Sequence, residues 1–426
     1  MPLEQYFPVL VKEFQGIILP QSIQFAITIA PIVLCIILAT IMWPLWVRYV
    51  RAKFFLSLKY TVLEISLPKD TFKSPLAMEV FLQSLHNTSN GSHFAQFWKG
   101  EMRPWYSLEV VSIEGRIKFF VWTEDRRKAG VINGLYSQFP GIEVKEVEDY
   151  TKSVHFDPDT MKVWAAEMKF TKDDAYPIKS YVDYGLDKDP KEEFKVDPML
   201  PMLEFLGSVG PNQQVWIQIL IQAHIPDKRK PGHWFKKVDS YQEGAKKLVN
   251  DIMIRDSKTK GIKAENKKSG EVFPDIPRLS KGEQDVAEAI ERSVSKLSFD
   301  TGIRGIYMGS KESFNTIFGV GGILGSFKHF NTEHLNGFKP NGDVWHPRLG
   351  DPWKDYKDIR RNRYAADAIA MYKRRSYHYA PHEGKPLVMS TEELATVYHF
   401  PGSVAATPTL QRIPSKKAEA PSNLPL

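Results

Sequence analysis

The chain has one cysteine, and several catalytic patterns are missing from its 426 residues. Cys35 alone can form neither an intrachain disulfide nor a cysteine-based metal site, which fits a reducing compartment. The one Gly-Lys pair, Gly384-Lys385, is followed by Pro386, so no phosphate-binding P-loop exists. A Gly-x-Ser-x-Gly nucleophile elbow is also missing. The sequence therefore gives no support for a nucleotide hydrolase or a serine or cysteine nucleophile.

Metal and dinucleotide signals are weak as well. His378 and His382 are four residues apart, but Pro381 argues against a helix there and no third ligand is evident. The glycines between Gly319 and Gly325 miss the Gly-x-Gly-x-x-Gly spacing by one residue and lie within a predicted helix, which indicates packing or a helix break. We predict no metal, no cofactor and no enzymatic activity.

Charge is missing from one long stretch near the N-terminus. From Phe25 to Val47 the chain has no charged residue, and a hydrocarbon core of about 30 Å needs about 20 apolar residues in a helix. Trp43 and Trp46 lie where an interfacial aromatic belt is expected. We predict a transmembrane helix over 23–47. The alternative is a cleaved signal peptide, which has a shorter apolar region followed by a small-residue cleavage site.

The charges on either side of this stretch predict its orientation. Lys12 is the one basic residue before the span, whereas four follow it closely: Arg48, Arg51, Lys53 and Lys59. Basic residues beside a span are retained in the cytoplasm. We expect residues 1–22 outside an inner (cytoplasmic) membrane, a single pass, and the bulk of the chain in the cytoplasm. The net charge of +7 is compatible with nucleic acid or anionic lipid as a partner.

Residues 60–150 predict a ferredoxin-like βαββαβ module. Ser74-Pro75 is a helix cap followed by proline, and Glu114-Gly115 is a tight hairpin turn. A polar loop is expected between the first helix and the second strand, through Gly100. The predicted elements are strand 60–67, helix 75–86, strands 105–113 and 116–123, helix 125–139 and strand 142–148.

Residues 160–400 predict a second module of the same kind, with insertions at about 226–298 and 331–385. Asp197-Pro198 repeats the cap-then-proline pattern, which favours a duplication. Ser280–Glu283 and Ser390–Glu393 are capping boxes. The expected elements are strand 162–170, helix 198–208, strand 213–224, inserted helices 240–254 and 281–297, strand 302–308, helix 311–330, a last strand at 386–389 and a short helix from Ser390. The Pro/Ser/Lys-rich tail, 403–426, is expected to be flexible. The fold class is therefore α+β.

Basic clusters remain as candidate contact sites for nucleic acid or anionic lipid. One cluster lies in the first insertion, between Lys246 and Lys268. The other is interleaved with tyrosines, which can stack on bases. Its members are Arg360, Arg361, Arg363, Lys373, Arg374 and Arg375. The alternative is a solvated face balanced by neighbouring aspartates.

Three stretches carry a family resemblance. They are Tyr60–Ile65 with Ser74–Glu79; Tyr136–Val144 continuing to Tyr150; and Ser390–Pro401 followed by Thr407-Pro408 and Ser415–Pro425. Together they resemble the N-terminal, non-ATPase region of membrane-linked type IV secretion or conjugation proteins of candidate-phyla (Patescibacteria-like) bacteria. In fuller relatives the last stretch leads into a RecA-like motor. No position here matches that motor's catalytic residues, so its activity does not carry over.

The resemblance implies a non-enzymatic, membrane-anchored component that scaffolds or recruits a cytoplasmic motor ATPase of a DNA-transfer apparatus. The candidate docking residues are Ser390, Glu393, Tyr398, His399, Phe400, Pro401, Lys416 and Lys417. Packing of the last helix onto the sheet is the alternative for this segment. A membrane-tethered nucleic-acid-binding protein is the second hypothesis, and a subunit that completes a partner's active site is the third. An oligomer is compatible with all three.

Overall fold

The computed structural model describes residues 19–68, 74–89, 91–187, 196–226, 228–229, 237–259, 279–341, 355–402 and 412–413. These residues belong to two compact units. We call Met1–Ser57 with Asn90–Met102 the anchor unit, and Leu58–Ser89 with Arg103–Leu426 the sheet unit. The tail expected to be flexible lies outside the described residues, except for the strand β12 (Arg412–Ile413), which pairs in parallel with β1 (Tyr60–Pro68).

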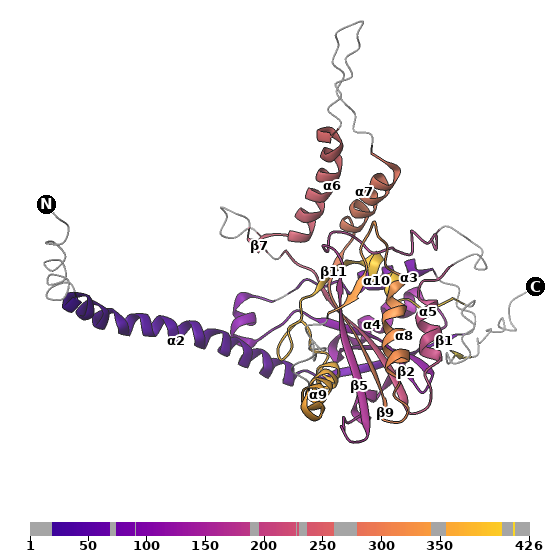
Figure 1. Ribbon diagram of the computed structural model, residues 1–426, viewed down its shortest axis with the longest axis horizontal. Coiled ribbons are helices and arrows are strands. Elements are labelled where there is room, and N and C mark those ends of the chain that lie inside the picture. The colour runs from indigo at the N-terminus through magenta and orange to yellow at the C-terminus, as the bar shows by residue number, and fades with distance from the viewer. Residues whose placement is uncertain are drawn as a thin grey trace, which may run out of the picture. The chain divides into compact units, whose positions relative to one another are not determined.

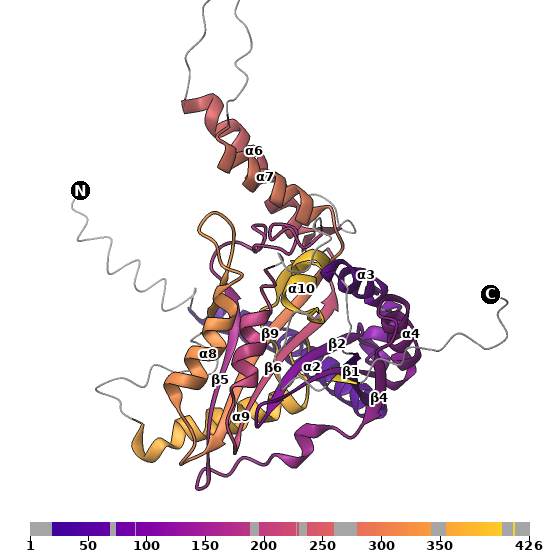
Figure 2. The same ribbon diagram turned by 90° about the vertical axis from the view of Figure 1, so that its right-hand side faces the viewer.

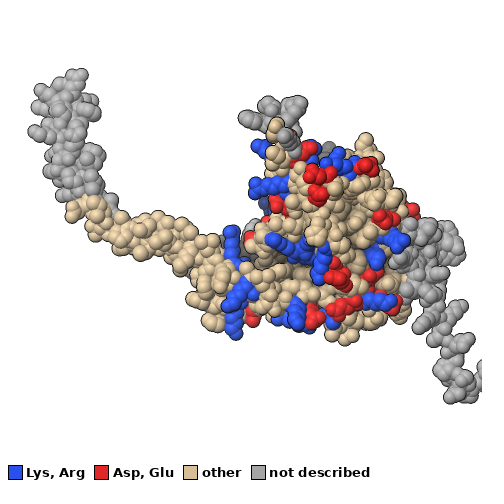
Figure 3. All heavy atoms as spheres, turned by 90° about the horizontal axis from the view of Figure 1, so that it is seen from below, with Lys and Arg blue, Asp and Glu red and all other residues tan. Residues whose placement is uncertain are grey.

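The anchor unit contains one long apolar helix, α2 (Leu19–Ser57) (Figure 1). Its length and composition are sufficient to cross a membrane, and its most apolar stretch is entirely unburied. Figure 3 shows the apolar part of this helix as a rod without the blue or red of charged residues. The helix continues about three turns beyond Val47, through the basic residues that follow the apolar run. Pro31 and Pro44 both lie inside it.

The first half of the sheet unit has the expected element order. Ser74 accepts a hydrogen bond from Leu76 N at the start of the first helix, and Glu114 and Gly115 both adopt positive φ in the hairpin turn. The elements are β1 (Tyr60–Pro68), α3 (Pro75–Leu85), β2 (Trp105–Ile113), β3 (Arg116–Glu124), α4 (Lys128–Gln138) and β4 (Glu143–Val147). Their strands pair antiparallel in the order β4-β1-β3-β2.

The second half repeats this order with a long insertion. Its elements are β5 (Met161–Phe170), α5 (Leu200–Gly207), β6 (Gln213–Ala223), β9 (Ser298–Ser310), α8 (Thr316–Lys328) and β10 (Phe338–Pro340). Their strands pair antiparallel in the order β10-β5-β9-β6. The two halves join where β2 pairs with β6, from Trp105↔Gln222 to Ile113↔Gln214. The result is one continuous, mainly antiparallel sheet.

The last strand differs from the expectation. The strand predicted at 386–389 is present as β11 (Leu387–Ser390), but it pairs antiparallel with the start of β9. The edge position beside β5 is taken by β10 instead. Three residues that include a proline are too short for an alternating pattern to be visible in the sequence.

The helices of both halves cover one face of the sheet. Side chains of α3, α4, α5, α8 and α10 (Thr391–Val397) join the sheet in one hydrophobic core. Leu108 and Val110 point into this core, so Glu109 between them points to the other face. That face carries α9 (Ile359–Lys373), whose Tyr372 packs against Trp216 at 5.0 Å between ring centroids.

The insertion between β6 and β9 forms a helical arm. It consists of α6 (Ser240–Thr259) and α7 (Lys281–Val294), which lie side by side and extend away from the sheet (Figure 2). A small apolar cluster holds the two helices together; it contains Ala245, Val249 and Ile290 and extends to Ala175. Both helices were predicted from the sequence, as was the capping box at Ser280.

Candidate functional site

The predicted capping box at the start of α10 is present and buried. Ser390 N donates to Glu393 Oε2 at 2.9 Å, and Glu393 N donates to Ser390 Oγ at 3.3 Å. Glu393 also accepts hydrogen bonds from Ile178 N at 3.0 Å and Ser293 Oγ at 3.2 Å. Burial raises the pKa of Glu393 to about 7, although these hydrogen bonds act in the opposite direction.

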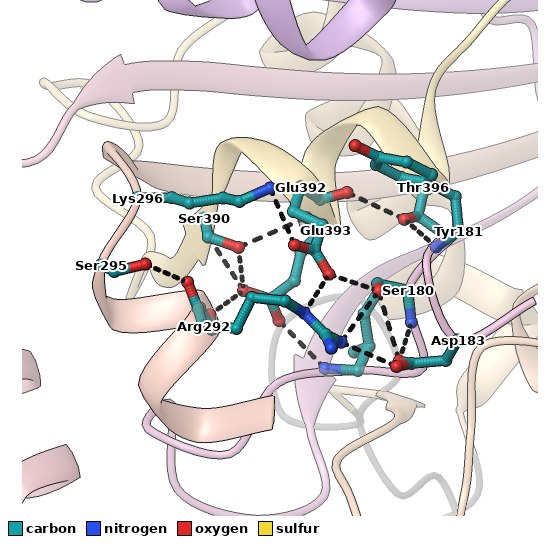
Figure 4. A network of polar contacts seen from close by, with 12 residues as sticks. Ser180, Tyr181, Asp183, Arg292, Ser295, Lys296, Ser390, Glu392, Glu393 and Thr396 are labelled. Atoms are coloured by element: carbon teal, nitrogen blue, oxygen red, sulfur yellow. Dashed lines mark hydrogen bonds and ion pairs between the residues drawn. The ribbon is translucent and has the colours of Figure 1, made fainter. Parts of the chain in front are cut away.

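A cluster of ion pairs that includes buried carboxylates lies beside this capping box (Figure 4). Lys296 Nζ lies 2.9 Å from both Glu79 Oε1 and Glu392 Oε2. Arg292 bridges Glu392, at 3.0 Å, and Asp183, at 2.7 Å. Burial lowers the pKa of Lys296, but hydrogen bonds to Glu392 and Glu79 outweigh it and raise the pKa above its ordinary value.

These contacts join four parts of the chain that are distant in sequence. They connect α3, the loop at 178–183, the end of α7 and α10, all around the capping box. Each carboxylate of the network is paired with a cation or accepts several hydrogen bonds, which is how buried charges are stabilised. These contacts are suited to fixing α10 in place. We call the residues that make them the α10 lock: Glu79, Ile178, Asp183, Arg292, Ser293, Lys296, Ser390, Glu392 and Glu393.

The other candidate docking residues on this segment are also buried. Phe400 packs edge-on against Phe119 and Phe139, at 5.5 and 4.8 Å between ring centroids. His399 hydrogen-bonds to Asp197, and Tyr398 and Pro401 are buried beside it. Lys416 and Lys417 lie outside the described residues. The six described residues from Ser390 to Pro401 therefore contribute to the core, which favours the packing alternative for this segment.

The six basic residues proposed for nucleic acid or lipid do not form one patch. Arg360, Arg361 and Arg363 are exposed on the first turns of α9, where Arg361 pairs with Asp358 at 2.8 Å. Arg374 is exposed at the other end of the helix, and Lys373 Nζ donates to Val154 O.

Arg375 is buried on the face of the sheet that carries α9. Its guanidinium pairs with Glu109, at 3.0 Å, and with Asp149. Gln218 of β6 donates to the same Glu109 at 2.9 Å, so this cluster lies across the β2–β6 seam. Arg375 is therefore part of the protein interior and cannot contact a nucleic acid in this conformation.

Arg361, one of the exposed arginines of α9, lines a cleft of about 750 Å³. The cleft lies between β5, the start of α8 and α9. Its charged lining residues are Lys162, Lys311, Arg361, Asp159 and Asp358, and its aromatic ones are Phe156, Trp164, Phe314 and Tyr364. A cleft with cations and aromatic faces can accept an anionic, planar ligand.

The loop of the anchor unit, predicted to be polar, contains an aromatic segment that the sequence pattern did not predict. Residues 95–99 form a single π-helical turn, and Trp46 Nε1 donates to Phe97 O at 3.1 Å. The signal was present in the sequence, because His93, Phe94, Phe97 and Trp98 fall within six residues. Such aromatic density is unusual in a loop that is solvated on all sides.

Among the residues that the structure describes, no group of three or more His, Cys, Asp or Glu side chains is arranged to hold a metal ion. His382 Nε2 lies 2.7 Å from Glu167 Oε1.

These features define a class: a mixed α/β protein with a large, mainly antiparallel sheet, preceded by an apolar N-terminal helix. The chain belongs to the family described as "Domain of unknown function (DUF8128)", whose match covers residues 57–412. No curated protein sequence matches it.

Proposed function

We propose that the protein is a membrane-anchored, non-enzymatic component of a type IV secretion-like or conjugative DNA-transfer apparatus that scaffolds or recruits a cytoplasmic ATPase. The observation that carries the anchoring is the unburied, uncharged stretch of α2. About 20 apolar side chains exposed to water would be strongly unfavourable at about 25 cal/mol per Å², so this surface requires a lipid environment. The segments at 60–79, 136–150 and 390–425 resemble type IV secretion or conjugation proteins. This resemblance supports a role in such an apparatus.

The proposed topology places the N-terminus outside and the sheet unit in the cytoplasm of a single-pass inner-membrane protein. Arg48, Arg51 and Lys53 directly after the apolar run support this orientation. The test uses a Cys35→Ser chain with Ile317→Cys, because Ile317 is 88% exposed on the sheet unit. A membrane-impermeant maleimide should label it only after the cells are permeabilised. Labelling in intact cells contradicts the orientation.

We further propose that the sheet unit is a duplicated ferredoxin-like scaffold. The strand orders β4-β1-β3-β2 and β10-β5-β9-β6 support this, since both are the order of a βαββαβ module. Edge-to-edge pairing of β2 with β6 removes one open edge from each half. A continuous sheet of this kind is a rigid base from which the arm can be presented to a partner.

The α6–α7 arm is the element that we propose for recruiting the ATPase. Because Ser390–Pro401 is buried, the contact surface must lie elsewhere. A groove of about 560 Å³ runs along the arm. It is lined by Gln242, Ala245, Lys246, Val249, Asn250, Ile290, Glu291, Val294 and Ser295. An apolar floor with charged rims is typical of a groove that accepts a partner helix.

The recruitment test compares neighbouring lysines of α6. Lys246 lines the groove, whereas Lys247 is exposed outside it. Nucleotide hydrolysis should co-purify from detergent-solubilised membranes with the wild type and with Lys247→Glu, and should be reduced at least tenfold with Lys246→Glu. A third chain that ends at residue 402 tests the tail. Equal hydrolysis in both lysine variants contradicts the role of the arm, and loss only in the shortened chain assigns recruitment to the tail.

The cleft beside α9 supports a second candidate function, binding of single-stranded nucleic acid. Charge reversal of Arg360, Arg361 and Arg363 should abolish a mobility shift with single-stranded DNA. In the wild type, log K should fall linearly with the logarithm of the salt concentration, with a slope of about 0.7 per phosphate contact. Arg374→Glu is the control, since Arg374 is exposed at the opposite end of α9 from Arg361, which lines the cleft. The absence of a shift in the wild type at low salt eliminates this candidate.

A further inference from the structure

A short aromatic segment packs along α2 within the anchor unit. Trp46 Nε1 donates to Phe97 O at 3.1 Å, and the Trp46 ring meets Trp98 at 5.7 Å between centroids. Trp43 lies 5.7 Å from Phe97 in the same way. Trp43 and Trp46 are three residues apart, so they lie on one face of the helix. We call Trp43, Trp46, Phe94, Phe97 and Trp98 the aromatic collar.

The fit between the segment and the helix depends on the backbone. Gly100 ends the π-helical turn in the left-handed region, with φ at 76°. A Cβ on this residue would lie 2.2 Å from Val50 O, which is closer than any side chain tolerates. Ser92 Oγ accepts a hydrogen bond from Ala95 N at the other end of the turn. The segment is therefore held against the helix by specific contacts.

The collar leaves large aromatic surfaces uncovered. Phe94 is 61% exposed and Trp98 is 55% exposed, although both are in a segment with defined packing. Trp43 and Trp46 are 45% and 36% exposed on the helix beside them. Exposed rings gathered in one place mark an interaction surface rather than an ordinary part of a solvated loop.

The position of the collar along α2 indicates what covers it. Cys35 lies near the middle of the uncharged run from Phe25 to Val47. Trp43 and Trp46 are 8 and 11 residues further on, which corresponds to about 12 and 16 Å along the helix at about 1.5 Å per residue. Half of a hydrocarbon core is about 15 Å, so the collar falls at the boundary between acyl chains and headgroups.

The chemistry of the collar fits this boundary. Indole rings favour the interface, where the ring is in the apolar layer and the N–H has polar partners. Arg48, Arg51, Lys53 and Lys99 lie just beyond or beside the aromatic residues in sequence, where anionic headgroups would meet them. The collar is also continuous with the apolar surface of α2, which a protein partner would not require.

We propose that the segment Gly91–Met102 is a second membrane contact, which inserts Phe94 and Trp98 into the interfacial layer of the bilayer. This inference rests on the proposed anchoring by α2. The helix then crosses the bilayer while the collar fixes its depth and restricts its rotation. The ligand is a lipid bilayer interface.

The experiment measures depth with nitroxide labels in phosphatidylcholine–phosphatidylglycerol vesicles. The single native cysteine, Cys35, carries the label at the centre of the span. In a Cys35→Ser chain, Phe94→Cys and Trp98→Cys carry it on the collar, and Ile317→Cys carries it on the sheet unit. Power saturation compares access to oxygen, which concentrates in the acyl region, with access to a water-soluble nickel chelate.

We expect oxygen to dominate at residue 35, the nickel chelate to dominate at 317, and intermediate values at 94 and 98. If the labels at residues 94 and 98 have the same reagent access as the label at residue 317, while the label at residue 35 remains in lipid, the collar inference fails and the anchoring stands. If the label at residue 35 also has the same reagent access as the label at residue 317, the anchoring itself fails. Labels at 94 and 98 that neither reagent reaches would indicate a protein contact and overturn the inference.

A measurement on native aromatic residues covers the case in which a label disturbs the collar. Lipids brominated near the headgroup should quench tryptophan fluorescence more strongly in the wild type than in Trp98→Phe. Gly100→Ala should also reduce the quenching, because the added methyl group collides with Val50 and separates the segment from α2. Unchanged quenching in both variants contradicts the proposal.

Discussion

At the residue scale, the chain contains two capping boxes that differ in their surroundings. Ser280 with Glu283 lies on the exposed start of α7, whereas Ser390 with Glu393 is buried in the α10 lock. The serine N to carboxylate distances are both 2.9 Å. The pair therefore isolates the effect of burial on an otherwise identical motif.

Replacing the serine should have unequal costs at the two positions. Ser280→Ala removes an exposed cap and should cost about 1 kcal/mol. Ser390→Ala also removes one donor to the buried Glu393 carboxyl and the Oγ acceptor of the buried Glu393 N–H, so we expect a loss of about 2–4 kcal/mol. Urea unfolding of both variants measures the difference. Equal losses would show that burial of the second box contributes nothing to the free energy of unfolding.

The raised pKa of Glu393 predicts a dependence of stability on pH. The folded pKa of about 7 lies above the ordinary glutamate value of 4.5, so the folded state holds the proton more tightly than the unfolded state. Stability from this group is fully present below about pH 4.5 and declines as pH rises to about 7, by about 3 kcal/mol.

Glu393→Gln tests this dependence, because glutamine does not titrate. The NH₂ group of the glutamine side chain is itself a donor and would face the Ser390 N–H donor, so the variant is expected to be less stable than the wild type at pH 5. The deficit relative to the wild type should shrink by about 3 kcal/mol between pH 5 and pH 8. The measurement is unfolding in urea at each pH. A deficit that stays constant with pH contradicts the assigned titration.

How well the site could be predicted differs between its parts. Both capping boxes follow from local spacing, so the sequence predicted them correctly. The partners of Glu393, Ile178 and Ser293, are distant in sequence, and no local pattern indicates that they converge. The same applies to Arg375, whose tyrosine-rich neighbourhood suggested a surface patch but whose partners are Glu109 and Asp149.

At the element scale, α8 shows that neighbouring glycines have different roles. A Cβ on Gly322 would lie 1.9 Å from the ring of Phe205 on α5, whereas a Cβ on Gly321 would meet nothing within 4 Å. The packing interpretation of this glycine run is therefore supported for Gly322 and also for Gly319, which faces Tyr307. The sequence alone does not distinguish these positions from Gly321.

Two alanine substitutions in α8 should therefore have opposite signs. Gly321→Ala should stabilise the protein by up to about 1 kcal/mol, since alanine favours the helix. Gly322→Ala should destabilise it by about 1–3 kcal/mol, because the added methyl group collides with Phe205. Thermal unfolding measures both. Two substitutions with the same sign contradict the close approach of α5 and α8.

Most elements of the sheet unit could be predicted, because alternation and helical periodicity are strong in the long elements. The predicted strands 105–113 and 213–224 correspond closely to β2 and β6. The pairing of these two strands with each other was not predicted, since both are buried on both faces and nothing in the sequence specifies the neighbour. The same limit explains why β11 was assigned to the wrong edge.

At the scale of the whole molecule, the β2–β6 seam predicts that the two halves of the sheet unit unfold together. Nine residue pairs join β2 and β6, from Trp105↔Gln222 to Ile113↔Gln214. The seam is reinforced on one face by the cluster of Glu109, Gln218 and Arg375. Separation of the halves would expose two edges and an unpaired buried charge, which is strongly unfavourable.

Hydrogen exchange of the slowest amides tests this cooperativity. Leu135→Ala creates a cavity in the first half and Ile323→Ala creates one in the second, and both side chains are fully buried. Each should cost about 3 kcal/mol, which corresponds to about a hundredfold faster exchange by global unfolding. Because the halves share one sheet, either substitution should accelerate exchange in both β3 and β9 by the same factor. Acceleration confined to the half that carries the substitution would show that the seam separates two independent folding units.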